Sequence, residues 1–397
     1  MSPAATAAAR RASTPAVAFA LPPGAGATAP PERRGVARDG VRLLVARPAG
    51  VTHGRFRDLP DQLEPGDLLV INTSATLAAA LDAARGDGRA AALHVSTALD
   101  DRDWVVEVRR ADGAGPALDV ARGERLLLPG GLRLRLVAPY PDPAARPTRL
   151  WRARARPPAA LPEYLARHGH PIAYGRPSER FPLSDHQTVY ATTPGSAEMA
   201  SAGRPFTAPL LVRLMARGVT VAPILLHAGV SSPERSEPPL PERFEVPADT
   251  ARLVRSAASA GRRVVAVGTT AARALESAVA PDGSVRAAGG WTGLVLGPDR
   301  PARVVSGLVT GLHEPEASHM LLLEAVAGPD LVRTAYDEAV AAGYLWHEFG
   351  DSMLLLPRRL SSGRVGRRCD GAPRRQATPR ASRDARPRPC AAAGAAR

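Results

Sequence analysis

The chain has no lysine, because all 52 of its basic residues are arginine. It has only two cysteines, Cys369 and Cys390, which leaves residues 1–356 without any disulfide or thiolate metal site. It also has no run of about 18 apolar residues, so we expect no transmembrane helix. The first residues place an arginine pair before a short apolar run that soon meets prolines, which is a poor signal peptide. We therefore expect a cytoplasmic protein with no metal and no membrane segment.

The positive charge is concentrated at one end of the sequence. The formal net charge is +14, which suggests a polyanionic partner such as RNA. Residues 357–397, however, hold 12 arginines and two aspartates, so they carry +10 of that charge. The remaining +4 on residues 1–356 is too little to argue for nucleic-acid binding from charge alone.

The most informative stretch is Arg262–Ser277, where an apolar strand is followed by a glycine and then by helix-forming residues. Val264–Val267 predicts the strand, and the helix series begins at Ala271. A threonine at such a junction, here Thr269 or Thr270, is typical of a helix cap. The free N–H groups of a first helical turn also favour an anion. Both interpretations of the junction stay open.

The neighbouring segments predict a parallel arrangement around this turn. Residues 220–226 favour a buried strand that ends at His227, and residues 248–260 favour an amphipathic helix. A strand, a helix and a second strand form a crossover unit whose strands are parallel. Because ligands bind beyond the carboxyl ends of such strands, His227 and the turn from Gly268 to Thr270 are expected at one edge.

The region from residue 89 to residue 158 has a different pattern. Short alternating runs are separated by turn-forming residues such as Pro129-Gly130-Gly131, which is typical of a small antiparallel sheet or barrel. We predict an α/β fold with a parallel or mixed sheet, flanking helices and a small inserted antiparallel β-barrel domain. The expected organisation is a disordered leader (1–16), a discontinuous α/β domain (17–88 and 159–356), the inserted β domain (89–158) and a disordered Arg/Pro/Ala-rich tail (357–397).

Seven motifs in order resemble one known family. They are FRDLPDQLEPGDLLVINTS, HQTVYATTPGS, ILLHAG, VVAVGTTAARALESA, GGWTG, GLHEP and AYDEAVAAGYLWHEFGDSMLL. Together they resemble the S-adenosylmethionine:tRNA ribosyltransferase-isomerases of queuosine biosynthesis, over roughly Phe19 to Leu356. The resemblance implies an α/β domain with an inserted β-barrel. It also implies transfer of the ribosyl part of S-adenosylmethionine, as cosubstrate, to a 7-aminomethyl-7-deazaguanine base in tRNA, forming epoxyqueuosine. The partners expected are tRNA and this small cosubstrate, and we expect a monomer.

Ribosyl transfer from a sulfonium needs a base for a ribose proton and a donor that helps adenine leave. The candidate catalytic residues are His227, His313, Asp351 and Glu242. The two histidines can equally be satisfied structural residues, Asp351 a turn residue, and Glu242 a solvated loop residue.

The candidate cosubstrate-binding residues are Gly268, Thr269, Thr270, Arg273 and Asn72. Arg273 is placed either to pair with a carboxylate of the ligand or to form a surface pair with Glu276, and Asn72 either to bind a base edge or to satisfy a turn.

Several positions depart from the family pattern. After Asn72, the family's Asp-Thr-Arg is replaced by Thr73, Ser74 and Ala75. Pro205 and Leu240 stand where histidines are expected. Lost arginines remove bidentate anion binders, and lost histidines remove acid–base groups. The alternative is therefore a diverged member with another acceptor, or a non-catalytic protein that binds an adenosyl ligand or RNA. A dinucleotide oxidoreductase is disfavoured because no G-x-G-x-x-G follows a strand.

Overall fold

The computed structural model describes residues 14–145, 147–174, 180–231, 239–315, 317–346 and 348–358. The leader and the tail expected from the sequence lie outside these ranges, apart from residues 14–16 and 357–358.

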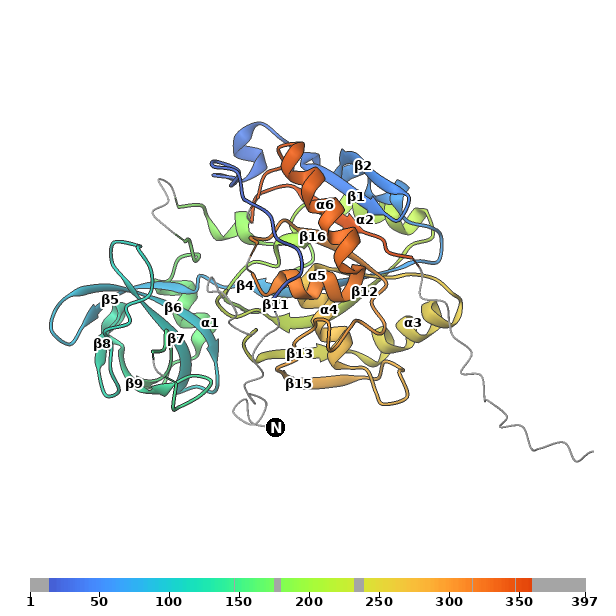
Figure 1. Ribbon diagram of the computed structural model, residues 1–397. Helices are drawn as coiled ribbons and strands as arrows, with labels where there is room; N and C mark the ends of the chain where they lie inside the picture. Colours follow the sequence, from blue (N-terminus) through green and yellow to red (C-terminus); the bar gives the residue numbers. More distant parts are fainter. Residues whose placement is uncertain are drawn as a thin grey trace, which may run out of the picture. The chain divides into compact units, whose positions relative to one another are not determined.

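A nine-stranded mixed sheet forms the centre of the α/β part (Figure 1). Its order is β15-β13-β12-β3-β14-β16-β17-β1-β2. The strands are β1 (Arg42–Arg47), β2 (Gly50–Arg55), β3 (Leu68–Asn72), β12 (Thr220–His227), β13 (Glu242–Val246), β14 (Val264–Val267), β15 (Ala288–Thr292), β16 (Gly307–Gly311) and β17 (Ser352–Leu355).

Helices cover both faces of this sheet, because its central strands carry apolar side chains on both faces. On β3, Leu68 and Val70 pack into the core shared with α3, α4, α5 and α6. Leu69 and Ile71 point into the opposite core, shared with α2 and the 3₁₀ helix η4 (Phe56–Gln62). The helices are α1 (Leu161–His168), α2 (Ala208–Ala216), α3 (Ala248–Ser259), α4 (Gly268–Ser277), α5 (His319–Ala327) and α6 (Pro329–Ala341).

The crossover predicted around Arg262–Ser277 exists, but it skips one strand. Strands β12 and β14 are parallel, as expected, yet both pair with β3, which lies between them. The chain also makes an antiparallel hairpin from β12 to β13 before it enters α3. Glu242 accordingly begins strand β13 and does not lie in a loop as expected.

A closed antiparallel barrel follows the order β10-β7-β6-β5-β8-β9. Its strands are β5 (Ala80–Arg85), β6 (Ala90–Ala98), β7 (Asp103–Arg110), β8 (Arg125–Leu127), β9 (Arg133–Pro139) and β10 (Leu150–Arg156). Its interior is filled by apolar side chains that include Leu93, Trp104 and Leu134. The predicted fold class, a mixed sheet with flanking helices plus a small antiparallel barrel, is confirmed. The barrel includes β5, which precedes the expected start at residue 89.

A short parallel pair joins the segment after β3 to a distant loop. Strand β4 (Ser74–Thr76) pairs with β11 (Thr193–Ser196). This pairing brings Ser74 and Ser196 to the carboxyl end of the neighbouring strand β12.

Candidate functional site

The candidate residues gather at one edge of the sheet because four neighbouring strands run the same way. Strands β12, β3, β14 and β16 are mutually parallel, so His227, Asn72, Gly268 and Gly311 end or follow them on one edge. Strand β17 runs antiparallel to β16 and pairs Ser352 with Gly311, so its start lies at the same edge. The predicted shared edge of His227 and Gly268–Thr270 is therefore present, and His313 and Asp351 adjoin it.

Asn72 ties three segments together at this edge. Its Oδ1 accepts from the N–H groups of Ser74 (3.1 Å) and Leu226 (3.0 Å). Its Nδ2 donates to the Leu226 carbonyl (2.8 Å) and to Thr270 Oγ1 (3.3 Å). The side chain is buried, and these bonds use its amide hydrogens and both of its acceptor sites. Asn72 therefore fixes the end of β12 next to the first turn of α4.

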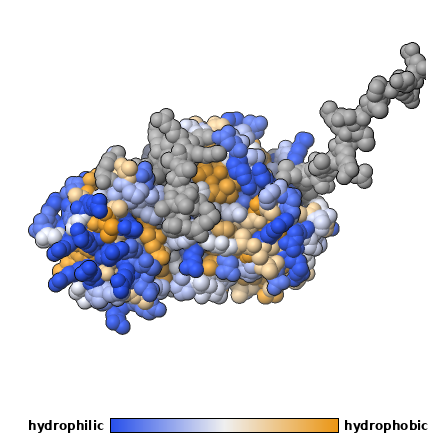
Figure 2. All heavy atoms as spheres, turned by 90° about the horizontal axis from the view of Figure 1, so that it is seen from below, coloured by the Kyte–Doolittle hydropathy of each residue, from blue (hydrophilic) through white to orange (hydrophobic). Residues whose placement is uncertain are grey.

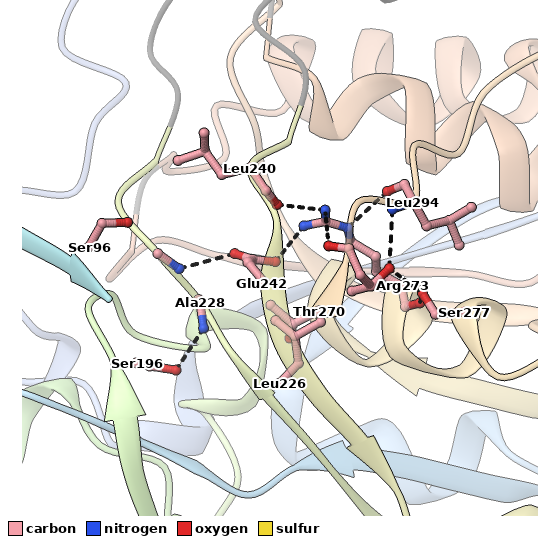
Figure 3. A network of polar contacts seen from close by, with 12 residues as sticks. Ser96, Ser196, Leu226, Ala228, Leu240, Glu242, Thr270, Arg273, Ser277 and Leu294 are labelled. Atoms are coloured by element: carbon pink, nitrogen blue, oxygen red, sulfur yellow. Dashed lines mark hydrogen bonds and ion pairs between the residues drawn. The ribbon is translucent and has the colours of Figure 1, made fainter. Parts of the chain in front are cut away.

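His227 begins a chain of polar contacts through two serines. Its Nδ1 lies 2.8 Å from Ser74 Oγ, and Ser74 Oγ lies 2.6 Å from Ser196 Oγ. Ser196 Oγ in turn accepts from the N–H of Ala228 at 3.0 Å (Figure 3). Gly195 allows the His227 ring to lie close to the backbone of β11, since a Cβ at position 195 would lie 2.3 Å from His227 Nδ1. Burial, with a smaller contribution from Arg243, lowers the pKa of His227, so the imidazole is neutral at pH 7.

Arg273 and Glu242 form a buried ion pair (Figure 3). The guanidinium also donates to the carbonyls of Leu294 (2.9 Å), Leu240 (2.7 Å) and Thr292 (3.1 Å). The other carboxylate oxygen of Glu242 accepts from the N–H of Gly229 at 3.1 Å. Burial raises the pKa of Glu242 and Arg273 opposes that rise. The two side chains therefore join α4, β13 and the segment after β12.

The alternative interpretation of Arg273, a surface pair with Glu276, is wrong. Glu276 is buried, and its Oε1 accepts from the N–H groups of Arg303 (2.8 Å), Val304 (2.8 Å) and Val305 (3.0 Å). Its other oxygen pairs with Arg300. On a buried helix face, the partners of side chains at positions i and i+3 come from other parts of the chain. The spacing of the two residues in the sequence does not reveal those partners.

Of the two interpretations of the start of α4, the threonine cap is wrong. Helix α4 already begins at Gly268, which has φ of +88°, and Val267 occupies the N-cap without a side-chain bond. Thr269 and Thr270 thus lie in the first turn, and both are half-buried. Thr270 uses its hydroxyl to accept from Asn72. Without a side-chain cap, the positive end of the helix dipole at this edge favours an anion or a hydroxyl oxygen.

His313 stacks on a histidine that sequence reasoning missed. The rings of His313 and His319 are parallel to within 3°, with centroids 4.5 Å apart. His313 Nε2 lies 3.0 Å from Thr310 Oγ1, and its carbonyl accepts from Trp346. Burial and His319 hold the pKa of His313 well below its usual range, and burial with Arg273 lowers that of His319 to about 4. Both rings are therefore neutral at pH 7.

Asp351 is fully engaged with the backbone. One carboxylate oxygen accepts from the N–H of Arg42 (2.8 Å) and the other from the N–H of Leu345 (2.9 Å). It lines a small cavity of about 10 Å³ together with Arg204, Pro205 and Glu348. Such a volume holds about one water, far less than a nucleoside.

Two glutamates near the cavity were also missed by sequence reasoning. Glu198 accepts from Tyr174 and from the N–H and hydroxyl of Ser231. Burial and the neighbouring Glu198 raise the pKa of Glu348 to about 8, and burial raises that of Glu198. Ser196 and Glu348 belong to recognised motifs, whereas no motif or local signal in the sequence marks Glu198.

No group of three or more His, Cys, Asp or Glu residues suited to a metal ion occurs within the described ranges. Across those same ranges, no helix is long and apolar enough to cross a membrane.

The fold and the residues at this edge define an α/β protein whose candidate site lies at the carboxyl edge of its sheet, where ligands of such folds bind. Residues 14–355 match the model of the queuosine biosynthesis protein family. The chain therefore belongs to the queuosine biosynthesis protein family.

Similar proteins cover most of the chain. One from Anaeromyxobacter dehalogenans is 37% identical over 352 residues, covering 86% of this chain and 98% of that protein. One from Symbiobacterium thermophilum is 36% identical over 330 residues, covering 80% and 94%. Both are named S-adenosylmethionine:tRNA ribosyltransferase-isomerase. A crystal structure of S-adenosylmethionine tRNA ribosyltransferase from Thermotoga maritima is 29% identical with a TM-score of 0.47, covering 86% of this chain and 99% of that one.

Proposed function

We propose that this chain transfers the ribosyl part of S-adenosylmethionine to a 7-aminomethyl-7-deazaguanine base in tRNA and isomerises it, forming epoxyqueuosine. Adenine and methionine leave in this reaction. Family membership supports the activity, as do the names of the relatives at about 35% identity. We further propose that the enzyme works in the cytoplasm as a monomer, with S-adenosylmethionine as cosubstrate and no metal.

The observation that carries the proposal is the chain from His227 through Ser74 to Ser196. His227 is neutral at pH 7 and stands at the carboxyl edge, so it can accept a proton there. Hydroxyl groups both donate and accept, so the Ser74–Ser196 pair can reverse its direction when the imidazole changes its protonated nitrogen. We assign His227 as the base that takes the ribose proton and His313 as the second proton-transfer group.

We assign some of the remaining candidate residues to contacts with the cosubstrate and the others to positioning the edge of the sheet. Gly268, Thr269 and Thr270 at the uncapped start of α4 are assigned to the cosubstrate. The polar atoms of the other four candidates already bind protein groups, so we assign these residues to positioning the edge. They are Asn72, Arg273, Glu242 and Asp351. Arg273 and Glu242 hold β13 against α4, and Asn72 holds His227 close to Thr270.

The second candidate function rests on the replaced motif positions. Ser74 stands where the family pattern has Thr, followed by Ala75 in place of Arg, and Pro205 stands in place of His. These changes favour a diverged member that keeps the adenosyl ligand but uses another acceptor.

Adenine release from S-adenosylmethionine, with and without tRNA bearing the 7-aminomethyl-7-deazaguanine base, separates the two functions. Release that depends on this tRNA supports the proposed reaction, and its loss in His227→Ala supports the base assignment. Calorimetric binding of S-adenosylmethionine without adenine release would favour the diverged binder.

A further inference from the structure

The outer surface of the barrel carries arginines that the strand register places opposite one another. Arg135 on β9 pairs with Arg125 on β8 and with Arg154 on β10. Two residues along β9, Arg133 pairs with Arg156 on β10. Residues paired across an antiparallel ladder point to the same face of the sheet. The arginine stripe is formed by Arg125, Arg133, Arg135, Arg154 and Arg156.

Alternation along the strands forces these side chains outward. Leu126, Leu134 and Ala155 lie between the arginines and are buried in the barrel core. Each of the five arginines is exposed. Figure 2 shows hydrophilic side chains gathered on the underside of the barrel, where Figure 1 places β9.

Most of the stripe has no ion-pair partner within the described ranges. Arg154 pairs with Asp103 at 2.7 Å. Arg125, Arg133, Arg135 and Arg156 form no ion pair with any residue that the structure describes. Like charges directly opposite each other destabilise a sheet. An arrangement that repeats this repulsion across three strands is therefore suited to an anionic partner that relieves it.

We propose that the arginine stripe binds the phosphate backbone of the RNA substrate, an inference that rests on the proposed function. Guanidinium groups bind phosphate oxygens in bidentate fashion. The two cross-strand rows lie about 7 Å apart along the strands and the strands about 4.8 Å apart, so the stripe presents several cations to successive phosphates. Because the net charge of residues 1–356 is low, it gives no indication that arginines are concentrated on one face of the barrel.

The test compares two variants that lose the same charge. The stripe variant is R125Q/R133Q/R135Q/R156Q, which leaves the Arg154–Asp103 pair intact. The control variant is R252Q/R262Q/R286Q/R333Q, which removes four exposed arginines from the α/β part. Far-UV circular dichroism and the melting temperature establish that both are folded before binding is measured.

The probe is a fluorescently labelled, unmodified tRNA anticodon stem-loop, titrated at several salt concentrations. Each lost phosphate contact lowers the slope of log K against log salt by about 0.9 for a duplex. We expect the stripe variant to lose about 3 to 4 units of slope and at least about tenfold in affinity at low salt. The control variant should keep the wild-type slope. Equal changes in both variants, or no change in the stripe variant, would overturn the proposal.

Two further measurements separate this proposal from the proposed function. In the adenine-release assay, the stripe variant should have a higher KM for tRNA than the wild type. Its kcat at saturating tRNA and its KM for S-adenosylmethionine should be unchanged. If the stripe variant is active and its KM for tRNA is unaltered, the proposal that the arginine stripe binds RNA is overturned, and the proposed function is not. Absence of adenine release from the wild type overturns the proposed function, while the stem-loop titration still tests the stripe. Stripe-dependent binding to anionic phospholipid vesicles without stripe-dependent RNA binding would identify a membrane surface and overturn the RNA assignment.

Discussion

The buried pair of Arg273 and Glu242 predicts a large and asymmetric loss of stability. Arg273→Met removes a guanidinium that serves Glu242 and three backbone carbonyls. Breaking a buried ion pair by removing one partner costs ~3–5 kcal/mol, because the other charge is left uncompensated. Glu242→Gln also leaves a buried charge without its counter-ion, but the glutamine oxygen and three backbone carbonyls still accept from Arg273, so we expect a smaller loss of ~1–3 kcal/mol.

The double variant R273M/E242Q tests the reasoning through a thermodynamic cycle. It contains no uncompensated charge, so it should cost less than the sum of the single variants by ~1 kcal/mol or more. Urea unfolding followed by far-UV circular dichroism measures each free energy of unfolding. Arg252→Gln is the control, since the Arg252–Asp249 pair is exposed and should change stability by no more than ~0.5 kcal/mol. Strict additivity of the two single variants would refute the uncompensated-charge argument.

Three further predictions concern the site and its surroundings. Gly195→Ala should lower adenine release while the protein stays folded, because the new Cβ would lie 2.3 Å from His227 Nδ1 and must displace the imidazole; wild-type turnover would contradict the assignment of His227. Ser74→Ala should lower kcat by ~10- to 100-fold with little change in the KM for S-adenosylmethionine, since it breaks the contact to His227 but touches no proposed ligand contact. Glu348 has its pKa raised to about 8 in the folded protein, above its ordinary value of about 4.3. The contribution of Glu348 to the free energy of unfolding is therefore complete below about pH 4.3 and is lost as pH rises through 8. Chemical denaturation should show Glu348→Gln becoming more stable relative to wild type between pH 5 and about 9. A difference in stability that does not change with pH would exclude the effect.

The strands and the barrel were predictable because their patterns are local. Val264–Val267 is an apolar run with a clear glycine stop, and residues 133–137 alternate with period two. The cap of helix α2 is equally local, because Thr207 accepts from the N–H of Leu210 three residues further on.

Most of the errors and omissions involve partners distant in sequence. The insertion of β3 between β12 and β14 depends on which strands pair, and no local pattern encodes that choice. Arg273 is 31 positions from Glu242, and its nearer candidate Glu276 is used by residues 303–305. The arginine stripe has a visible signal in alternating arginines of β9 and β10, but only the barrel register places the two strands' arginines opposite each other.

The most direct test of the central claim is the nucleoside composition of the tRNA after reaction. Purified protein, S-adenosylmethionine and tRNA bearing the 7-aminomethyl-7-deazaguanine base are incubated together, and the digested tRNA is analysed by liquid chromatography and mass spectrometry. We expect epoxyqueuosine to appear in equimolar amount with free adenine, and to disappear in His227→Ala. A tRNA whose modified base is unchanged, under conditions in which S-adenosylmethionine binds, would contradict the proposed reaction.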